Sequence, residues 1–208
     1  DCNPAVVICS KHDRNYDEFE NVCIVESSLI FSEQLSTPNW DSIDTSVKSA
    51  ILLYTSGTTG IPKATLLALD GIVDYLEWMR NYFSITHRDR LLFGMSISFD
   101  GSLGEMFSPL LNGASVIIST ARSWDPDRLL QQLHDNCITL CIGGGFVSST
   151  LQAVLDCGRL PESLRHAQVG GEAVPPGLMK QFYSHAHAKT SLHVTYGPSE
   201  AAVCATAI

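Results

Sequence analysis

The stretch ILLYTSGTTGIPK, residues 51–63, decides how the rest of the chain is interpreted. Its first four residues, Ile51 to Tyr54, form a short apolar run typical of a buried β-strand. The nine that follow, Thr55 to Lys63, contain four hydroxyl residues, two glycines, a proline and a lysine. Glycines let backbone N–H groups turn inward, hydroxyls add donors, and a lysine supplies positive charge for phosphate oxygens. This composition indicates either a polyphosphate-binding loop or a polar hairpin turn.

The loop differs from the Walker A type of phosphate loop. That pattern, GxxxxGK[ST], places the lysine directly after a glycine and a hydroxyl residue directly after the lysine. Here Lys63 follows Gly60 by three positions and is followed by Ala64. The loop is therefore not predicted to belong to a P-loop nucleotide hydrolase.

Outward from this loop, short β-branched runs alternate with stretches of helical period. Strands are predicted at residues 6–9, 22–25, 51–54, 91–93, 116–118, 139–142, 167–169 and 192–194. The polar segment 26–48 is interpreted as a connection between two βα portions. The alternation predicts an α/β fold with a largely parallel sheet covered by helices, and ligands at the carboxyl ends of the strands.

Three helices have recognisable start signals. The clearest covers residues 71–83, with Asp70 as its N-cap. A second is predicted to start at Ser102, whose spacing to Glu105 matches a capping box. A third has Asp125 as N-cap and Pro126 at its first helical position.

The composition narrows the class of protein. The chain has 208 residues, of which 45% are apolar and 17% charged, as expected for one globular α/β unit. The net charge of −9 argues against nucleic-acid binding, so a bound polyanion must be held by backbone N–H groups and a few cations. Seven cysteines without CxxC spacing indicate a reduced, cytoplasmic protein. No apolar run approaches the ~18 residues of a membrane span.

Four strings, in order, resemble those of one enzyme superfamily. YTSGTTGIPK resembles the phosphate loop of adenylate-forming enzymes, which include acyl-CoA synthetases, luciferases and the adenylation domains of nonribosomal peptide synthetases. SFDGSLGEMF (98–107), VGGEAVPP (169–176) and VTYGPSEAAVCAT (194–206) resemble further motifs of those adenylation domains. Ala64 replaces a usual glycine, and Val194 replaces an asparagine that helps to read adenine. The chain is thus similar to part of the large N-terminal domain of these enzymes.

The resemblance implies ATP-dependent activation of an amino acid as an aminoacyl adenylate, for loading onto the phosphopantetheine of a carrier-protein domain. Tyr196 would stack on adenine, Ser199 would face the α-phosphate, Glu200 would hold Mg²⁺, and Lys63 would contact the leaving pyrophosphate. Lys63, Ser199 and Glu200 are thus the expected catalytic residues. The expected ATP-binding residues are Thr55, Ser56, Gly57, Thr58, Thr59, Gly60, Lys63, Gly170, Gly171, Glu172, Tyr196, Gly197, Ser199 and Glu200.

Asp100 points to the substrate class. A carboxylate in an apolar segment needs a cationic partner, and the matching aspartate of the family receives the substrate α-ammonium. A local turn before Gly101 is the alternative explanation. The resemblance gives the substrate pocket as Asp100, Gly101, Gly104, Ile142, Gln168, Gly170, Thr195, Val203 and Cys204. Glycine at 101 and 104 would leave room for a bulky side chain.

The resemblance covers a central portion of the family's architecture. Residues 1–208 are expected to be a partial adenylation core, without the upstream N-terminal subdomain and without the mobile C-terminal domain. The ribose-binding aspartate and the catalytic lysine of that C-terminal part would then be missing, so the 208 residues alone are expected to be inactive. Two alternatives stay open: a noncatalytic adenylate-fold module used for binding or scaffolding, and part of an acyl- or aryl-CoA ligase.

Overall fold

The computed structural model describes residues 6–9, 23–26, 48–55, 62–121 and 125–208. The chain divides into two units, Asp1–Thr45 and Ser46–Ile208. In the first unit, strand β1 (Val6–Cys9) pairs in parallel with β2 (Cys23–Glu26). Both strands were predicted from the sequence. The predicted connection over residues 26–48 lies almost entirely outside the described residues.

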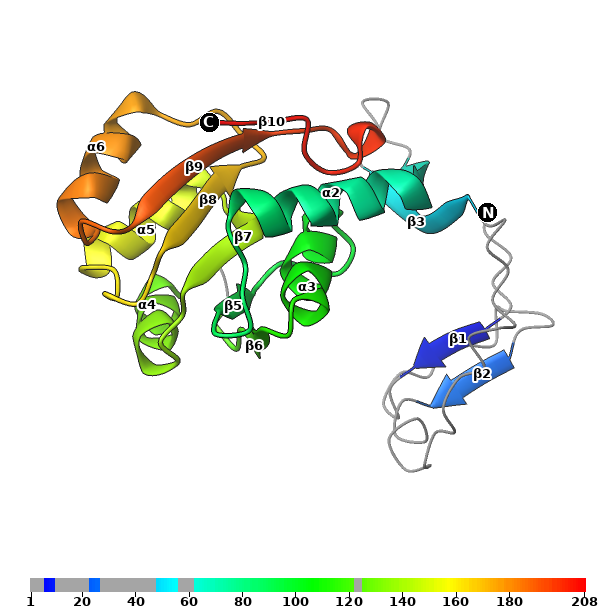
Figure 1. Ribbon diagram of the computed structural model, residues 1–208, viewed down its shortest axis with the longest axis horizontal. Helices are drawn as coiled ribbons and strands as arrows, with labels where there is room; N and C mark the ends of the chain where they lie inside the picture. The colour runs from blue at the N-terminus through cyan, green and yellow to red at the C-terminus, as the bar shows by residue number, and fades with distance from the viewer. Residues whose placement is uncertain (1–5, 10–22, 27–47, 56–61, 122–124) are drawn as a thin grey trace. The chain divides into compact units, whose positions relative to one another are not determined.

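The second unit is built on a six-stranded sheet with the order β10-β9-β8-β7-β5-β6 (Figure 1). Its strands are β5 (Arg90–Phe93), β6 (Ser115–Ile118), β7 (Leu140–Phe146), β8 (His166–Gly170), β9 (Ser191–Tyr196) and β10 (Thr206–Ala207). Neighbouring strands pair in parallel except β9 and β10, which are antiparallel. The predicted α/β fold with a largely parallel sheet is confirmed.

Helices cover both faces of this sheet (Figure 1). Helices α2 (Leu69–Tyr82) and α3 (Gly101–Leu111) pack on one face around a core that includes Met79, Phe83 and Leu103. On the other face lie α4 (Pro126–Asp135), α5 (Ser148–Cys157) and α6 (Pro176–His185), with a core of leucines and Phe182. None of the helices in the described ranges is long and apolar enough to cross a bilayer.

The strand order places a topological switch point between β5 and β7. From β5 the chain passes through α3 to β6, on one side of β5. It then crosses through α4 to β7, on the opposite side, and continues through β8 to β9. Because the connections leave the carboxyl ends of β5 and β7 in opposite directions, a crevice is expected there, and ligands of α/β sheets bind in such crevices.

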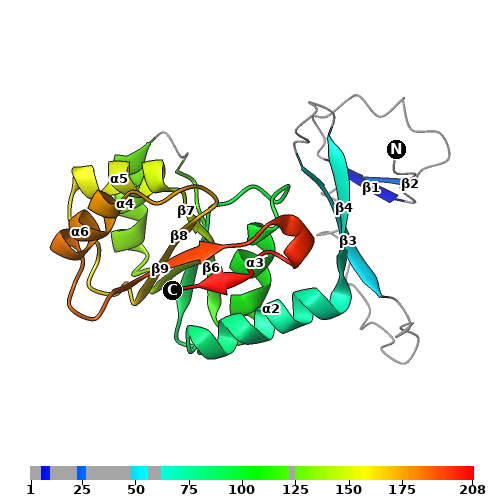
Figure 2. The same cartoon turned by 90° about the horizontal axis from the view of Figure 1, so that it is seen from above.

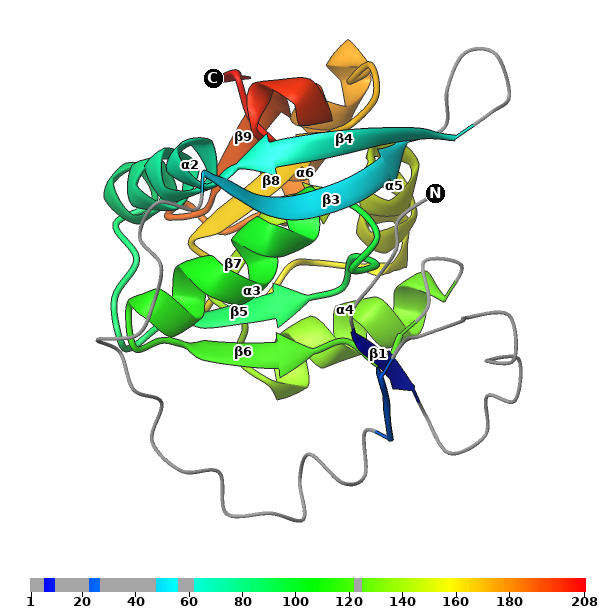
Figure 3. The ribbon, with the colours of Figure 1, turned by 90° about the vertical axis from the view of Figure 1, so that its right-hand side faces the viewer.

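A separate hairpin precedes the sheet. Strand β3 (Ser49–Thr55) pairs antiparallel with β4 (Lys63–Ala68), so that Thr55 lies opposite Lys63 (Figure 3). Figure 3 also shows β5 and β6 side by side, running in the same direction. Strand β3 was predicted, whereas β4 was not, because its sequence KATLLA lacks the alternation that marks a half-buried strand.

Two of the three predicted helix starts are wrong in detail. Helix α2 begins at Leu69 with Ala68 as N-cap, and Asp70 lies in the first turn. Helix α3 begins at Gly101 with Asp100 as N-cap, and Ser102 lies inside the helix with 2% of its surface exposed. Tertiary contacts override the local capping signal at Ser102. The third prediction is confirmed, since the Asp125 carboxylate accepts a hydrogen bond from the Arg128 N–H at 3.2 Å.

Asp89 links residues that precede the central strands β7 and β8 through an ion pair and a hydrogen bond. Its carboxylate pairs with Arg165 at 2.9 Å, just before β8, and accepts a 2.7 Å hydrogen bond from the Thr139 hydroxyl, just before β7. Burial alone would raise the pKa of Asp89, but hydrogen bonds from Thr139 and Thr86 and the Arg165 charge lower it below its ordinary value. The ionised carboxylate therefore stabilises the end of the sheet opposite the switch point.

Candidate functional site

A cavity of about 390 Å³ lies at the carboxyl ends of the sheet strands. It is lined by the start of α3 and by the ends of β7, β8 and β9. Eight of the residues predicted to bind substrate or nucleotide line this cavity: Asp100, Gly101, Gln168, Gly170, Gly171, Thr195, Gly197 and Val203. They come from segments about 100 residues apart in the sequence, which only the parallel sheet brings together.

Three residues predicted for the substrate pocket lie elsewhere. Ile142 is fully buried in the core beneath α2 and α3. Gly104 packs against another element: a Cβ added there would stand 2.5 Å from the Tyr75 hydroxyl and 2.9 Å from the Gly143 Cα. Cys204 lines a different cavity, of about 310 Å³, beside α2. The predicted substrate-pocket positions thus divide between the cavity lining, the core and the smaller cavity beside α2.

The wall of the main cavity contains a glycine bulge in β7. Pairing between β7 and β8 shifts register between Cys141 and Phe146, over three consecutive glycines. Gly143 and Gly145 have φ values of +94° and +58°, in the left-handed region that other residues rarely adopt. Sequence reasoning placed Ile142 in the pocket, one position before this bulge. The run of three glycines was the available signal for an irregular strand.

Gln168 braces this bulge from β8. Its side-chain amide donates to the Gly143 carbonyl at 2.8 Å and to the Thr195 hydroxyl at 2.9 Å. Its carbonyl oxygen accepts from the Gly143 N–H at 3.0 Å. Because both amide hydrogens are used internally, Gln168 cannot donate to a ligand. The Thr195 hydroxyl, which accepts from Gln168, keeps its own hydrogen available to one.

Asp100 is both a helix cap and a cavity residue. One of its carboxylate oxygens accepts a 2.7 Å hydrogen bond from the Gly101 N–H, which supports the predicted local turn. The side chain is half-buried and lines the cavity. Among the residues that the structure describes, the one salt bridge joins Arg165 to Asp89, so no described cation neutralises Asp100. The cap and a ligand contact are compatible, because a carboxylate has two oxygens.

Glu105 is a buried carboxyl near the cavity that sequence reasoning did not assign to the site. It projects from α3, is 3% exposed, and accepts hydrogen bonds from the N–H groups of Gly94 and Met95, both at 2.9 Å. Burial raises the pKa of Glu105 to about 7, while its backbone hydrogen bonds oppose that increase. The spacing to Ser102 predicted that this glutamate belongs to a capping box, whereas its hydrogen bonds lie in the loop after β5.

The predicted nucleotide motifs lie partly outside the described residues. Ser56, Gly57, Thr58, Thr59 and Gly60 belong to the range 56–61 and are not described, and for Thr55 only the backbone is described. Lys63 begins β4, which contacts the 3₁₀ turn η2 (Ser199–Ala201), as Figure 2 shows. The hairpin that carries Lys63 is therefore next to the turn that carries Ser199 and Glu200.

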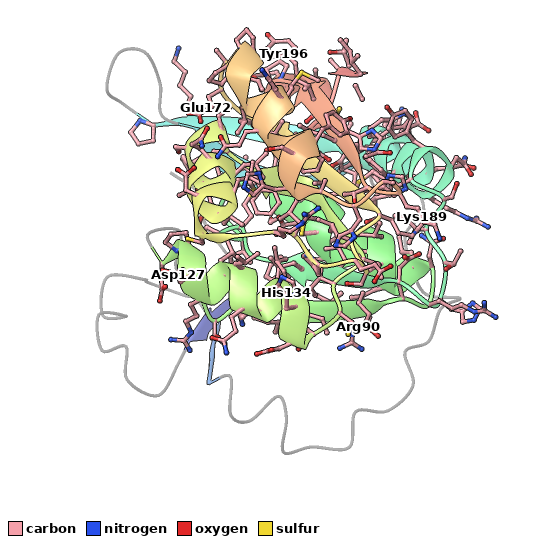
Figure 4. All side chains as sticks on the ribbon, turned by 90° about the vertical axis from the view of Figure 1, so that its left-hand side faces the viewer. Arg90, Asp127, His134, Glu172, Lys189 and Tyr196 are labelled. Carbon is pink, nitrogen blue, oxygen red and sulfur yellow. The ribbon has the colours of Figure 1, made fainter. Side chains whose placement is uncertain are left out.

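Two further predicted nucleotide residues lie at the carboxyl edge of the sheet. Tyr196 ends β9 and is 69% exposed. Glu172 is also exposed and accepts a 3.3 Å hydrogen bond from the Ser149 N–H at the start of α5. Figure 4 shows both at the same end of the unit, opposite Arg90 and His134. An exposed ring at this edge is available for stacking on a base.

A family model described as "AMP-binding enzyme" matches residues 1–208. The chain belongs to the AMP-binding enzyme family. Curated members of this family are similar to it along most of its length. Tyrocidine synthase 3 of Brevibacillus parabrevis is 33% identical over 83% of the chain, and vanchrobactin synthetase VabF of Vibrio anguillarum is 33% identical over 99%. The chain spans only 3% and 7% of the length of these two relatives.

Solved structures show the same fold. The nonribosomal peptide synthetase FmoA3 in its α-methyl-L-serine-AMP-bound form matches 98% of this chain with a TM-score of 0.84, at 23% identity and over 22% of its own length. The N-terminal subdomain of NpsA from Klebsiella oxytoca, in complex with anthranilyl-AMSN, matches 98% of this chain with a TM-score of 0.77, at 21% identity and over 51% of its length. The chain thus shares the fold of these solved structures.

Proposed function

We propose that this chain is part of an enzyme that activates an amino acid with ATP, forming an aminoacyl adenylate for transfer to a carrier protein. The observation that carries this proposal is the cavity itself. It joins Asp100 and Gly101 of the segment resembling an amino-acid-recognising motif to Gly170, Gly171 and Gly197, which lie in segments resembling adenine-side motifs. An acid and a nucleotide must meet for the carboxylate to attack the α-phosphorus, and one cavity offers both contacts.

The proposed contacts with the nucleotide come from residues at or near the ends of strands and in the turns that follow them. Tyr196 would stack on adenine, with the backbone of Gly170 and Gly171 beside it. Lys63 and the hydroxyl-rich loop before it would hold the pyrophosphate leaving group, so that charge on several oxygens is neutralised during attack. The turn η2, which carries Ser199, contacts β4, which carries Lys63. From this turn Ser199 would face the α-phosphate.

Glu200 is the described residue that fits a magnesium ion. It is exposed in η2 and faces solvent, and Mg²⁺ is commonly held by one or two carboxylates together with substrate phosphates and water. A bound Mg²⁺ would supply positive charge to the phosphate oxygens of ATP. No cluster of three or more potential metal ligands occurs in the described part of the chain, and substrate phosphates and water would supply the other ligands.

The amino-acid part of the proposal rests on Asp100. A half-buried, ionised carboxylate without a described cationic partner is stabilised when a ligand ammonium binds next to it. Acyl or aryl acids have no such group. We therefore assign amino acids as the substrate class, with a phosphopantetheine-bearing carrier protein as the acceptor. Cys137, Cys141, Cys157 and Cys204 are free thiols, which agrees with the reducing cytoplasm as the proposed place of the reaction.

Binding to the 208-residue chain tests the proposal. Non-hydrolysable aminoacyl-sulfamoyl adenosines and their des-amino analogues are titrated by calorimetry into wild type and Asp100→Asn. Asparagine also caps helices, so the substitution keeps α3 intact while removing the charge. Loss of one member of a buried charged pair costs ~2–5 kcal/mol, so we expect at least tenfold weaker binding of the aminoacyl analogue.

The des-amino analogue should bind both proteins about equally, since it has no ammonium to lose. Asp70→Asn, an exposed carboxylate in the first turn of α2, is the control and should leave both affinities unchanged. Equal losses for both analogues would show that Asp100 supports the fold or the nucleotide. Tighter binding of des-amino or aryl analogues by wild type would favour an acyl- or aryl-activating enzyme instead.

A further inference from the structure

A second, smaller cavity lies beside the first at the switch point. It has a volume of about 160 Å³ and is lined on the α4–α5 face by apolar side chains that include Leu92, Leu129 and Phe146. Met95 and Val147 line both cavities. Met95 follows β5 and Val147 follows β7, the two strands whose connections diverge. These two residues therefore lie where the two cavities adjoin.

The Met95 side chain fills the space that two glycines leave open. A Cβ added to Gly101 would stand 2.9 Å from the Met95 sulfur, and a Cβ added to Gly144 would stand 2.6 Å from it. The sulfur thus packs directly on the backbones of α3 and β7. This changes the expectation that Gly101 enlarges the substrate pocket, because Met95 and the Gly144 backbone occupy the room beside it.

The backbone at Met95 is held in place, whereas its side chain is adaptable. Glu105 accepts hydrogen bonds from the N–H groups of Gly94 and Met95, which anchors the loop after β5 to α3. The methionine side chain itself is unbranched and can fill an irregular gap. An anchored position with an adaptable side chain is suited to setting the depth of a pocket.

We propose that Met95 is a specificity-determining residue that limits the length of the substrate side chain by closing the substrate pocket off from the second cavity. This inference rests on the proposed function, and it concerns the same site. Because the second cavity is mainly apolar, its opening would admit longer apolar side chains, such as linear aliphatic ones. Glu105, Ser119 and Thr150 also line this cavity, so the test uses uncharged aliphatic extensions, which contact its apolar side chains.

The test compares ligands of increasing length. Aminoacyl-sulfamoyl adenosines carrying alanine, 2-aminohexanoic acid and 2-aminooctanoic acid are titrated into wild type, Met95→Ala and Met95→Leu. A methylene in a fitted apolar pocket changes binding by about tenfold. We therefore expect Met95→Ala to raise the preference for the 2-aminooctanoyl over the alanyl analogue at least tenfold. Met95→Leu, which conserves volume, should leave that ratio within threefold of wild type.

A second variant distinguishes the opening of the smaller cavity from a general loss of packing around residue 95. Thr150 on α5 also lines the smaller cavity, so Thr150→Leu in the Met95→Ala background should fill it and return the preference toward wild type. Thermal unfolding of each variant confirms that it is folded. An unchanged preference ratio in folded Met95→Ala would overturn the inference. Failure of every analogue to bind wild type would instead overturn the proposed function.

Discussion

Glu105 makes the stability of this protein depend on pH in an unusual direction. Burial raises the pKa of the folded-state carboxyl from its ordinary value of 4.5 to about 7. The folded protein therefore binds this proton more tightly than the unfolded chain does. The contribution of Glu105 to stability is fully present below pH 4.5, and it is lost progressively as the pH rises through about 7.

The size of the effect follows from the two pKa values. Each pKa unit corresponds to about 1.4 kcal/mol, so ionising Glu105 in the folded state costs roughly 3 kcal/mol at pH 8. Glu105→Gln removes this titration, while the amide oxygen can still accept from the Gly94 and Met95 N–H groups. The glutamine amide group also puts a donor where the carboxylate accepts from the Gly145 backbone. This mismatch lowers the stability of the variant, and the loss does not depend on pH.

The measurement is therefore the difference in pH dependence and not the stability at one pH. Denaturant unfolding of wild type and Glu105→Gln is followed between pH 4.5 and 8.5. Relative to the variant, wild type should lose about 3 kcal/mol across this range, equivalent to roughly 6–12 °C in melting temperature for a domain of this size. Glu77→Gln, an exposed carboxylate of α2, serves as control. Parallel pH curves for wild type and Glu105→Gln would refute the assignment of a buried, titrating Glu105.

Two further predictions concern stability. Gly104→Ala should destabilise the protein by about 1–3 kcal/mol in denaturant unfolding, because the new Cβ would meet Tyr75 and the β7 backbone, whereas Gly177→Ala on α6, with nothing within 4 Å, should have no such cost. Burial and the nearby His193 lower the pKa of His166 to about 4, so wild type should lose stability as the pH falls from about 6.5 to about 4. His166→Gln should lose less over that window, and an equal loss in both proteins would contradict the buried neutral pair.

Several features of the site could be predicted from the sequence because their signals are local. Three of the four motifs, at residues 98–107, 169–176 and 194–206, follow or include the carboxyl ends of β5, β8 and β9. Asp100 and Gly101 were assigned to a ligand cavity from a ten-residue string, and both line it. The capping prediction at Ser102 was wrong for a physical reason. The start of a buried helix depends on the residues that pack against it, and the Glu105 carboxylate accepts its backbone hydrogen bonds from the loop after β5.

The sequence by itself determined the fold class and the family, because hydrophobic period and glycine-rich strings are properties of contiguous residues. Only the tertiary structure decided that both Gly101 and Gly104 are close-packing positions. They are three residues apart on one helix, and they pack against different neighbours. The same holds for Met95, whose sulfur meets Gly144, 49 positions further along the chain. Contacts between distant segments depend on strand order and register, and a switch point between β5 and β7 cannot be read from either strand alone.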